Sequence, residues 1–227
     1  MAYRIAVVED DESVRRMLVE ALTEHGYEVK GYKDGTAGLA GLRGAPPALV
    51  LLDLGLPGLS GIEVCRALRA DSATSRVLVV MLTGLNAEAD EILGFEVGAD
   101  DYVTKPFAIG ALVARIHGLL RRNATPSPDA TLVHGPLVIH TKRREALLAG
   151  KLLPLTPTEF RLLHMLVANR DRTLSRQEMI ETEPGGKEGR DRKVDVHVTS
   201  LREKLGSHGT RMIETVYGEG YRIGKAS

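Results

Sequence analysis

The chain has little cysteine and few aromatic residues. Its single cysteine excludes a fold that is held together by internal disulfides. One of its 227 residues is cysteine, none is tryptophan, and aromatic residues make up 4%. Cys65 cannot form an internal disulfide. It shares one face of a predicted helix with Ile62 and Leu68, so we expect it in the core. The seven histidines have no cysteine partners and no metal-ligand spacing, which argues against a zinc site.

Long apolar runs are also missing. None approaches the ~20 residues that a membrane-spanning helix needs. The chain starts with a strand pattern at 3–8 rather than with the layout of a signal peptide, so we expect a cytoplasmic protein with no membrane partner. With 43% hydrophobic and 26% charged residues, a disordered chain is excluded. The length suffices for two ordinary domains.

The charge is unevenly distributed. Residues 1–122 hold 13 Lys+Arg against 17 Asp+Glu, a net charge of −4, and residues 123–227 hold 17 against 13, a net charge of +4. This asymmetry favours two domains with different partners, with nucleic acid as the partner of the basic domain. The stretch NATPSPDA at 123–130 has two prolines and no apolar period, so it predicts a linker between domains at 1–122 and 131–227.

The first domain alternates apolar runs with helical patterns. The patterns predict strands at 3–8, 27–32, 48–53, 76–82 and 101–104, and helices at 13–24, 35–43, 60–70, 86–97 and 109–121. Strands that alternate with helices in this way are typical of a doubly wound, five-stranded parallel sheet in the α/β class.

Chemically reactive side chains follow these strands. Asp53 ends the third strand, Glu9 and Asp10 follow the first, and Thr83 and Lys105 follow the fourth and fifth. Taken singly, these residues have ordinary explanations as strand caps or solvated charges. However, the carboxyl ends of parallel strands form one crevice, and three carboxylates gathered there repel each other unless a cation lies between them. Oxygen ligands beside a phosphate site favour Mg²⁺. The set therefore predicts phosphoryl transfer onto a carboxylate.

The strings VVEDD, LLDLGLPG, MLTG and DDYVTKPF resemble, in this order, the receiver domain of bacterial response regulators, which has a flavodoxin-like fold. The resemblance implies that Asp53 accepts a phosphoryl group from a sensor histidine kinase and that Lys105 binds it. It implies Mg²⁺ as cofactor, held by Asp10, Asp53 and the main-chain carbonyl of Gly55, with Glu9 acting directly or through water. It also implies a coupled Thr83–Tyr102 switch and a cis Lys105–Pro106 bond. Such a receiver assists its own phosphorylation and dephosphorylation without being a conventional enzyme.

Gly55 departs from the family pattern, in which the residue two after the acceptor is often large. Without a side chain there, water can reach an acyl phosphate more easily. We therefore expect a relatively short-lived phosphoprotein.

The second domain predicts an α+β winged helix-turn-helix. Short apolar pieces and turn signals at 131–155 indicate an antiparallel meander. Helices begin near Pro157 and Ser175, and a third spans about 190–205, with its apolar stripe at Val194, Val198, Leu201 and Leu205. A hairpin over 212–223 follows. The exposed face of the third helix is basic, which suits DNA, although an isolated helix with such a face is often merely solvated.

The strings LTPTEFRLL, KVDVHVTSLREKLG and VYGEGYRI resemble the effector domain of the OmpR/PhoB family. The resemblance implies that the third helix enters the major groove, that the wing reaches the minor groove, and that the loop at 182–190 touches RNA polymerase. Family members often carry arginines at the positions of Thr199 and Ser200, and aromatic residues in that loop, so base preference and polymerase contact cannot be transferred. The predicted DNA contacts are Arg190, Arg192, Lys193, His197, Thr199, Ser200, Arg202, Lys204 and Arg222.

In this family, phosphorylation pairs two receivers through the fourth helix, fifth strand and fifth helix. The charges that match this pattern are Asp101 with Arg115 and Glu96 with His117. Glu91 and Ala111 stand where a basic and an acidic residue are common, so one ion pair is missing and we expect a weaker or more pH-dependent homodimer.

Together these patterns predict a response regulator that binds promoter DNA under the control of phosphorylation. One alternative is a regulator of the same fold that binds DNA regardless of phosphate. Another is a phosphatase that forms an aspartyl phosphate, but such enzymes need a second acid two residues after the nucleophile, where this chain has Gly55.

Overall fold

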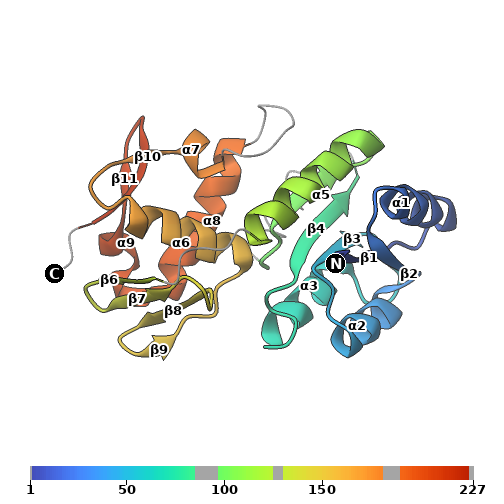
Figure 1. The fold of residues 1–227 in the computed structure, drawn as a ribbon, viewed down its shortest axis with the longest axis horizontal. Coiled ribbons are helices and arrows are strands. Elements are labelled where there is room, and N and C mark those ends of the chain that lie inside the picture. The colour runs from blue at the N-terminus through green and yellow to red at the C-terminus, as the bar shows by residue number, and fades with distance from the viewer. Residues whose placement is uncertain (1, 85–96, 125–129, 181–189, 225–227) are drawn as a thin grey trace. The chain divides into compact units, whose positions relative to one another are not determined.

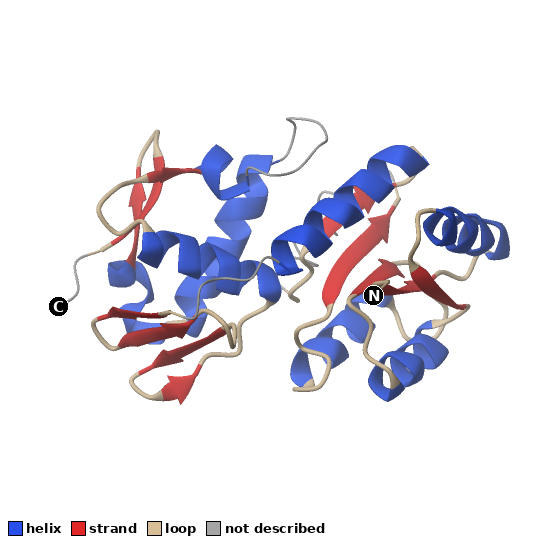
Figure 2. Ribbon diagram, viewed as in Figure 1, coloured by secondary structure: helices blue, strands red, loops and turns tan. Residues whose placement is uncertain are grey.

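The computed structural model describes residues 2–84, 97–124, 130–180 and 190–224 (Figure 1). The chain divides into two compact units, Met1–Asn123 and Ala124–Ser227. Figure 2 shows that each unit combines helices with strands. Across the described ranges, every helix is too short or too polar to cross a membrane.

The first unit contains a five-stranded parallel sheet with the strand order β2-β1-β3-β4-β5. The predicted doubly wound fold is thus confirmed, while the predicted helix at 86–97 lies, apart from its last residue, outside the described residues. The strands are β1 (Arg4–Val8), β2 (Glu28–Tyr32), β3 (Leu49–Asp53), β4 (Leu78–Thr83) and β5 (Asp101–Thr104). The described helices are α1 (Glu12–Glu24), α2 (Gly35–Gly44), α3 (Gly61–Ala70) and α5 (Ile109–Ala124).

The central strands of the sheet are buried on both faces, because helices cover both. Every residue of β3 and β4 is buried. Helices α1 and α5 lie over one face, where Leu18 and Ile116 pack on Leu51, and α2 and α3 lie on the other side of the sheet (Figure 1). This explains why the central strands are continuous apolar runs rather than alternating ones.

Local capping fixes where the helices begin. The Asp11 carboxylate caps α1, the Asp34 carboxylate caps α2, and Ser60 forms a capping box with Glu63 at α3. Each cap satisfies main-chain N–H groups that have no partner inside the helix. The turns between strand ends and helices are therefore tightly defined, and Glu9 and Asp10 lie in the turn between β1 and α1.

The second unit has two antiparallel sheets around a helical core. The strands of the first sheet are β6 (Thr131–His134), β7 (Leu137–His140), β8 (Glu145–Leu148) and β9 (Lys151–Leu152). The helices are α6 (Pro157–Ala168), α7 (Arg176–Ile180), α8 (Arg190–Lys204) and α9 (Gly209–Met212), with a 3₁₀ turn at Gly206–His208. The second sheet has the order β10-β12-β11, formed by β10 (Leu174–Ser175), β11 (Ile213–Val216) and β12 (Gly220–Ile223).

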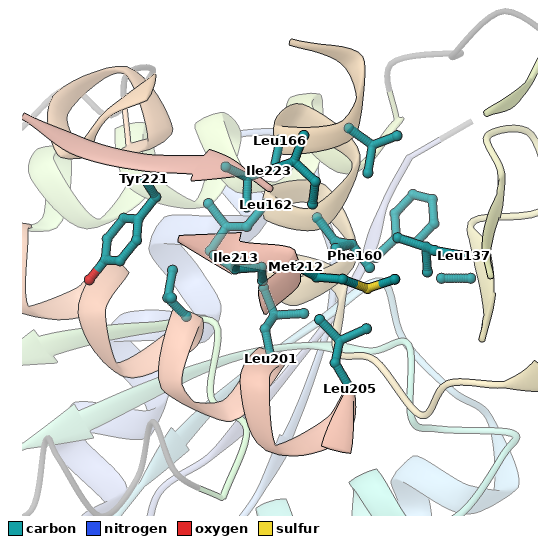
Figure 3. Packing of buried hydrophobic residues seen from close by; sticks show 14 of the residues in the cluster. Leu137, Phe160, Leu162, Leu166, Leu201, Leu205, Met212, Ile213, Tyr221 and Ile223 are labelled. Atoms are coloured by element: carbon teal, nitrogen blue, oxygen red, sulfur yellow. The ribbon is translucent and has the colours of Figure 1, made fainter. Parts of the chain in front are cut away.

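The predicted apolar stripe of α8 is confirmed. All four of its residues are at most 2% exposed, and they face the core that Leu162 and Leu166 of α6 share with Ile213 and Ile223 of the hairpin (Figure 3). The sequence did not predict β10, which pairs with β12, or α9. Both are too short to carry a periodic signal.

Candidate functional site

Lys105 joins two buried carboxylates at the carboxyl end of the parallel sheet. Its ammonium Nζ donates to both Glu9 oxygens, at 3.0 and 2.8 Å, and to Asp53 Oδ1 at 2.8 Å. Glu9 is 1% exposed and Asp53 7%. Strands β1, β3, β4 and β5 are neighbours, which is why residues 9, 53 and 105 meet. The structure confirms that these side chains converge at the carboxyl end of the sheet, as predicted.

Burial disfavours the charged forms of Glu9 and Lys105 in this pocket. Burial raises the pKa of Glu9, the hydrogen bond from Lys105 opposes the rise, and the charge of Asp53 adds to it. For Lys105, burial acts to lower the pKa, but hydrogen bonds with Asp53 and Glu9 outweigh it, so the pKa is raised and the side chain stays charged. One ammonium group thus faces more negative charge than it can neutralise.

Asp10 completes an acidic cluster. Glu9, Asp10 and Asp53 each offer a carboxylate oxygen within 4.8 Å of the others, and Asp10 is exposed to solvent. Such an all-oxygen donor set, open on one side and short of positive charge, fits a hard divalent cation. The Gly55 N–H donates to Asp53 Oδ2 at 3.1 Å, so the turn after β3 contacts the same carboxylate.

Thr83 and Tyr102 lie on the neighbouring strands β4 and β5. Thr83 is 1% exposed, and its hydroxyl donates to the Gly84 carbonyl at 3.4 Å. Tyr102 is 3% exposed. Their coupling as a switch stays a prediction. The Lys105–Pro106 bond is cis, as expected.

In the second unit, helix α8 does not present all of the predicted contacts to solvent. His197 is 4% exposed, so its prediction as part of an exposed basic face is wrong. It lies three residues after Val194 and four before Leu201, which places it within the apolar stripe. That spacing was visible in the sequence. The side chains of Arg190, Arg192 and Lys193 lie outside the described residues.

Two further residues that were predicted to contact DNA bind a buried acid within the unit. Ser200 Oγ donates to Glu159 Oε1 at 2.6 Å, and Lys204 Nζ donates to both Glu159 oxygens, at 2.8 and 2.6 Å. Glu159 belongs to α6 and is 1% exposed. Thr199, by contrast, is exposed, with its hydroxyl on the Asp195 carbonyl. These contacts fix α8 on α6, which sequence spacing alone could not reveal.

The remaining arginines support the hairpin. Arg202 donates to the Ile213 carbonyl at 2.6 and 3.0 Å and to Thr215 Oγ1 at 2.9 Å. Arg222 pairs with Glu214 of the opposite strand at 2.7 Å. Both side chains therefore have contacts inside the unit, besides any that they could make with a ligand.

Tyr221 connects the hairpin to two helices. Its hydroxyl donates to Asp195 Oδ1 at 2.7 Å, and the same oxygen accepts from Arg176 Nε at 2.7 Å. The guanidinium groups of Arg176 and Arg202 lie 4.9 and 5.6 Å from the centre of its ring. Figure 3 shows this ring at the edge of the core, with its hydroxyl pointing away from the apolar side chains. Hairpin and α8 are thereby held in one arrangement.

Comparison with known proteins agrees with both halves of this description. Residues 5–117 match the response regulator receiver domain, and residues 150–223 match the C-terminal domain of transcriptional regulatory proteins. The phosphate regulon transcriptional regulatory protein PhoB of Pseudomonas aeruginosa is 37% identical over 98% of both chains. The DNA-binding response regulator MtrA of Mycolicibacterium smegmatis is 41% identical over 99% of this chain and 98% of its own.

This chain belongs to the OmpR/PhoB family of response regulators. Among solved structures, DrrB, an OmpR/PhoB homologue from Thermotoga maritima, covers 99% of the chain with a TM-score of 0.53 and 31% identity. A mutant form of RitR covers 99% of the chain with a TM-score of 0.82 at 23% identity, and this likeness concerns the fold.

Within this response regulator, one predicted dimer pair is an ion pair inside the chain. Arg115 Nη1 donates to both Asp101 oxygens, at 3.0 and 2.8 Å, and Asp101 is fully buried. Pairing of these residues across an interface would have to share or replace this contact. His117 is exposed, while Glu96 and all but the last residue of the loop at 182–190 lie outside the described residues.

Arg15 is a residue of the pocket that sequence reasoning missed. It belongs to α1, and its guanidinium donates to the main-chain carbonyls of Glu9 and Asp10. A side chain that binds carbonyl groups leaves no pattern in the sequence. Its position one turn after Asp11, beneath the acidic pair, was the available signal.

Proposed function

We propose that this response regulator accepts a phosphoryl group on Asp53 from a sensor histidine kinase and that this modification controls its binding to promoter DNA. The observation that carries the proposal is the contact of Lys105 with both Asp53 and Glu9 in a buried pocket, in a chain that also holds a winged helix. Because the kinase's phosphoryl donor and the DNA are cytoplasmic, we place the protein in the cytoplasm.

The residues of the pocket have distinct roles in this reaction. An Asp53 oxygen attacks phosphorus, the O–P bond forms, and the P–N bond to the histidine of the kinase breaks, with the released imidazole taking up a proton. The Lys105 ammonium is placed to bind an oxygen of the transferred group. Burial keeps competing water away from Asp53 on the sheet side.

The acidic cluster is proposed to hold Mg²⁺ through Asp10, Asp53 and the Gly55 carbonyl, with Glu9 direct or through water. When bound, the ion supplies positive charge that offsets the crowded carboxylates and the incoming phosphate. Glu9 also holds Lys105 beside Asp53. We expect Thr83 and Tyr102 to respond to the phosphoryl group.

DNA binding is assigned to residues 190–199 of α8 and to the wing. Arg190, Arg192, Lys193 and Thr199 are the proposed groove and phosphate contacts. Since Ser200, Arg202 and Lys204 are held by other residues of the unit, we assign them to supporting roles. Arg222 remains a wing contact if it leaves Glu214. RNA polymerase at 182–190 and a phosphorylation-dependent homodimer are the other proposed partners.

The deciding experiment is intact mass spectrometry after treatment with Mg²⁺ and acetyl phosphate. The parent should gain about 80 Da, the mass of one phosphoryl group, and Asp53→Asn should gain nothing. Both proteins are then titrated with promoter fragments. A parent that stays unmodified but binds DNA tightly would instead support the phosphate-independent alternative.

A further inference from the structure

We infer that Arg15 is a positioning residue for the acidic pair, holding the main chain of Glu9 and Asp10 so that both carboxylates face a divalent cation. This rests on the proposed function of the pocket. Arg15 Nη1 lies 2.8 Å from the Glu9 carbonyl oxygen and 3.1 Å from that of Asp10. One guanidinium nitrogen thus joins two consecutive peptide groups of the turn that carries the cation ligands.

The turn is fixed at both ends, and Arg15 fixes its middle. At the start, the Glu9 N–H donates to the Tyr32 carbonyl at 3.1 Å. At the end, Asp11 accepts from the first turn of α1 at 2.8 and 3.0 Å. Arg15 acts between these anchors. Arg15 therefore holds Glu9 and Asp10 through their backbones, whereas Lys105 binds the Glu9 carboxylate.

The shape of the neighbouring strand makes room for this arginine. Gly31 in β2 lies beside it, and a Cβ atom there would be 3.4 Å from both Cγ and Cδ of Arg15. A Cβ atom at this position would thus already touch the stem of the arginine. The half-buried guanidinium is thus held in place by packing and by two hydrogen bonds together.

Unlike Lys105, Arg15 leaves the carboxylate oxygens of the acidic pair available to a cation. Lys105 binds carboxylate oxygens, whereas both hydrogen bonds of Arg15 end on carbonyl oxygens, so it occupies none of the carboxylate oxygens that a cation would need. Groups that orient metal ligands in this indirect way typically change metal affinity 10- to 100-fold when removed.

Arg16 supplies a matched control. It is the next residue of the same helix and has the same charge, but its side chain is 78% exposed and pairs with Glu20. We would measure Mg²⁺ binding to the full unphosphorylated chain by isothermal titration calorimetry. The dissociation constant should rise roughly tenfold in Arg15→Ala and less than twofold in Arg16→Ala. Arg15→Lys should fall between Arg15→Ala and the parent, because one ammonium group can hold a carbonyl but cannot reproduce the guanidinium.

Circular dichroism establishes that each variant is folded, and if Arg15→Ala is not, the comparison rests on Arg15→Lys. The inference is overturned if the folded Arg15 variants bind Mg²⁺ as tightly as the parent, or if Arg16→Ala loses as much affinity, since the loss would then not depend on the contacts of Arg15 with the Glu9 and Asp10 carbonyl groups. Failure of the proposed function looks different: the parent itself would neither bind Mg²⁺ nor gain a phosphoryl group.

Discussion

The Lys204 ammonium lies 2.6 Å from a carboxylate oxygen of Glu159, and this ion pair joins the last turn of α8 to the first turn of α6. Glu159 also accepts from the Thr156 N–H in a capping box. Burial acts to raise the pKa of Glu159, but the charge and hydrogen bonds of Lys204, followed by Ser200 and Thr156, lower it below its usual range. A residue that the sequence assigned to DNA binding is thus part of the support of α8.

Lys204→Ala should destabilise the second unit by about 1–3 kcal/mol at pH 7, because it leaves a buried carboxylate short of a partner. The folded-state pKa of Glu159 is depressed, so its stabilising contribution exists above the unfolded pKa of about 4.3 and is lost as pH falls. The loss caused by Lys204→Ala should therefore shrink toward pH 4. Urea unfolding of the full chain at pH 7 and pH 4 measures the loss of stability, with methyl NMR signals from the core of the second unit as the probe.

Lys151→Ala, at an exposed position of β9, is the control for the Lys204 variant and should leave stability nearly unchanged. An equal loss in Lys204→Ala at pH 7 and pH 4 would show that the ion pair contributes nothing and that the stem of the lysine acts by packing alone.

Arg202→Ala should weaken DNA binding without much change in its salt dependence. Arg202 holds the Ile213 carbonyl and lies over the ring of Tyr221, so its loss should loosen the hairpin. A residue that neutralises a phosphate instead lowers the slope of log K against log[salt] by about one unit. Fluorescence anisotropy with a promoter fragment at several salt concentrations separates the two roles, with Lys193→Ala as the expected phosphate contact.

A slope that falls in Arg202→Ala as much as in Lys193→Ala would return Arg202 to the DNA interface. Tyr221→Phe gives an independent check, because it removes the hydroxyl that binds Asp195 but keeps the ring over which both guanidinium groups lie. It should loosen the hairpin less than Arg202→Ala does, and the free energy of unfolding should fall by about 1 kcal/mol or less.

Most of the fold and of the pocket of the first unit could be predicted from the sequence, because local signals specify where the strands of a doubly wound sheet end. Continuous apolar runs bounded by Pro, Gly and acidic residues predict that Asp53 and Lys105 lie at the carboxyl ends of their strands. Only the order of strands turns these separate ends into one pocket, and alternation of strands with helices predicts that order well.

The second unit was harder to predict at the level of side chains. The positions of Ser200 and Lys204 on α8 say that they share a flank, but not that Glu159 lies opposite them. Contacts from a side chain to distant backbone, such as Arg202 to Ile213, depend on tertiary packing and leave no periodic signal. His197 was different, since its spacing from Val194 and Leu201 already placed it on the buried stripe.

Gly55→Met should prolong the lifetime of the phosphorylated protein. Among the described residues, a Cβ atom at Gly55 would come within 4 Å only of the Asp53 Oδ2 atom, at 3.3 Å, so a side chain there would lie directly beside the acceptor. A large side chain there would limit the access of water to the acyl phosphate. The lifetime follows from intact mass measured over time after the phosphodonor is removed.

Gly44→Met is the control for that variant, because no described atom lies within 4 Å of a Cβ atom at Gly44, and this residue lies at the end of α2, away from the pocket. Its phosphate lifetime should equal that of the parent. If Gly55→Met keeps its phosphate no longer than the parent does, water access at this position does not limit hydrolysis, and the expected short lifetime needs another cause.

Gly35→Ala should destabilise the first unit, although alanine favours helices more than glycine does. Gly35 is the first residue of α2, and a Cβ atom there would clash with the carbonyl oxygen of Leu59 in the turn that follows β3. Backbone atoms cannot move aside as a flexible side chain can, so the expected cost is about 1–3 kcal/mol. Thermal unfolding of the full chain, followed by methyl NMR signals of the first core, measures the effect.

Gly44→Ala on the same helix should do the opposite and stabilise the unit by up to about 1 kcal/mol, because no described atom lies within 4 Å of an added Cβ atom. The pair separates helix propensity from contact: two stabilising substitutions would mean that the approach of α2 to the turn is not tight. If Gly35→Ala also slows phosphorylation by acetyl phosphate, the close approach at Leu59 helps to hold the turn that contains Gly55. Glycine at 35 would then serve the acceptor as well as the fold.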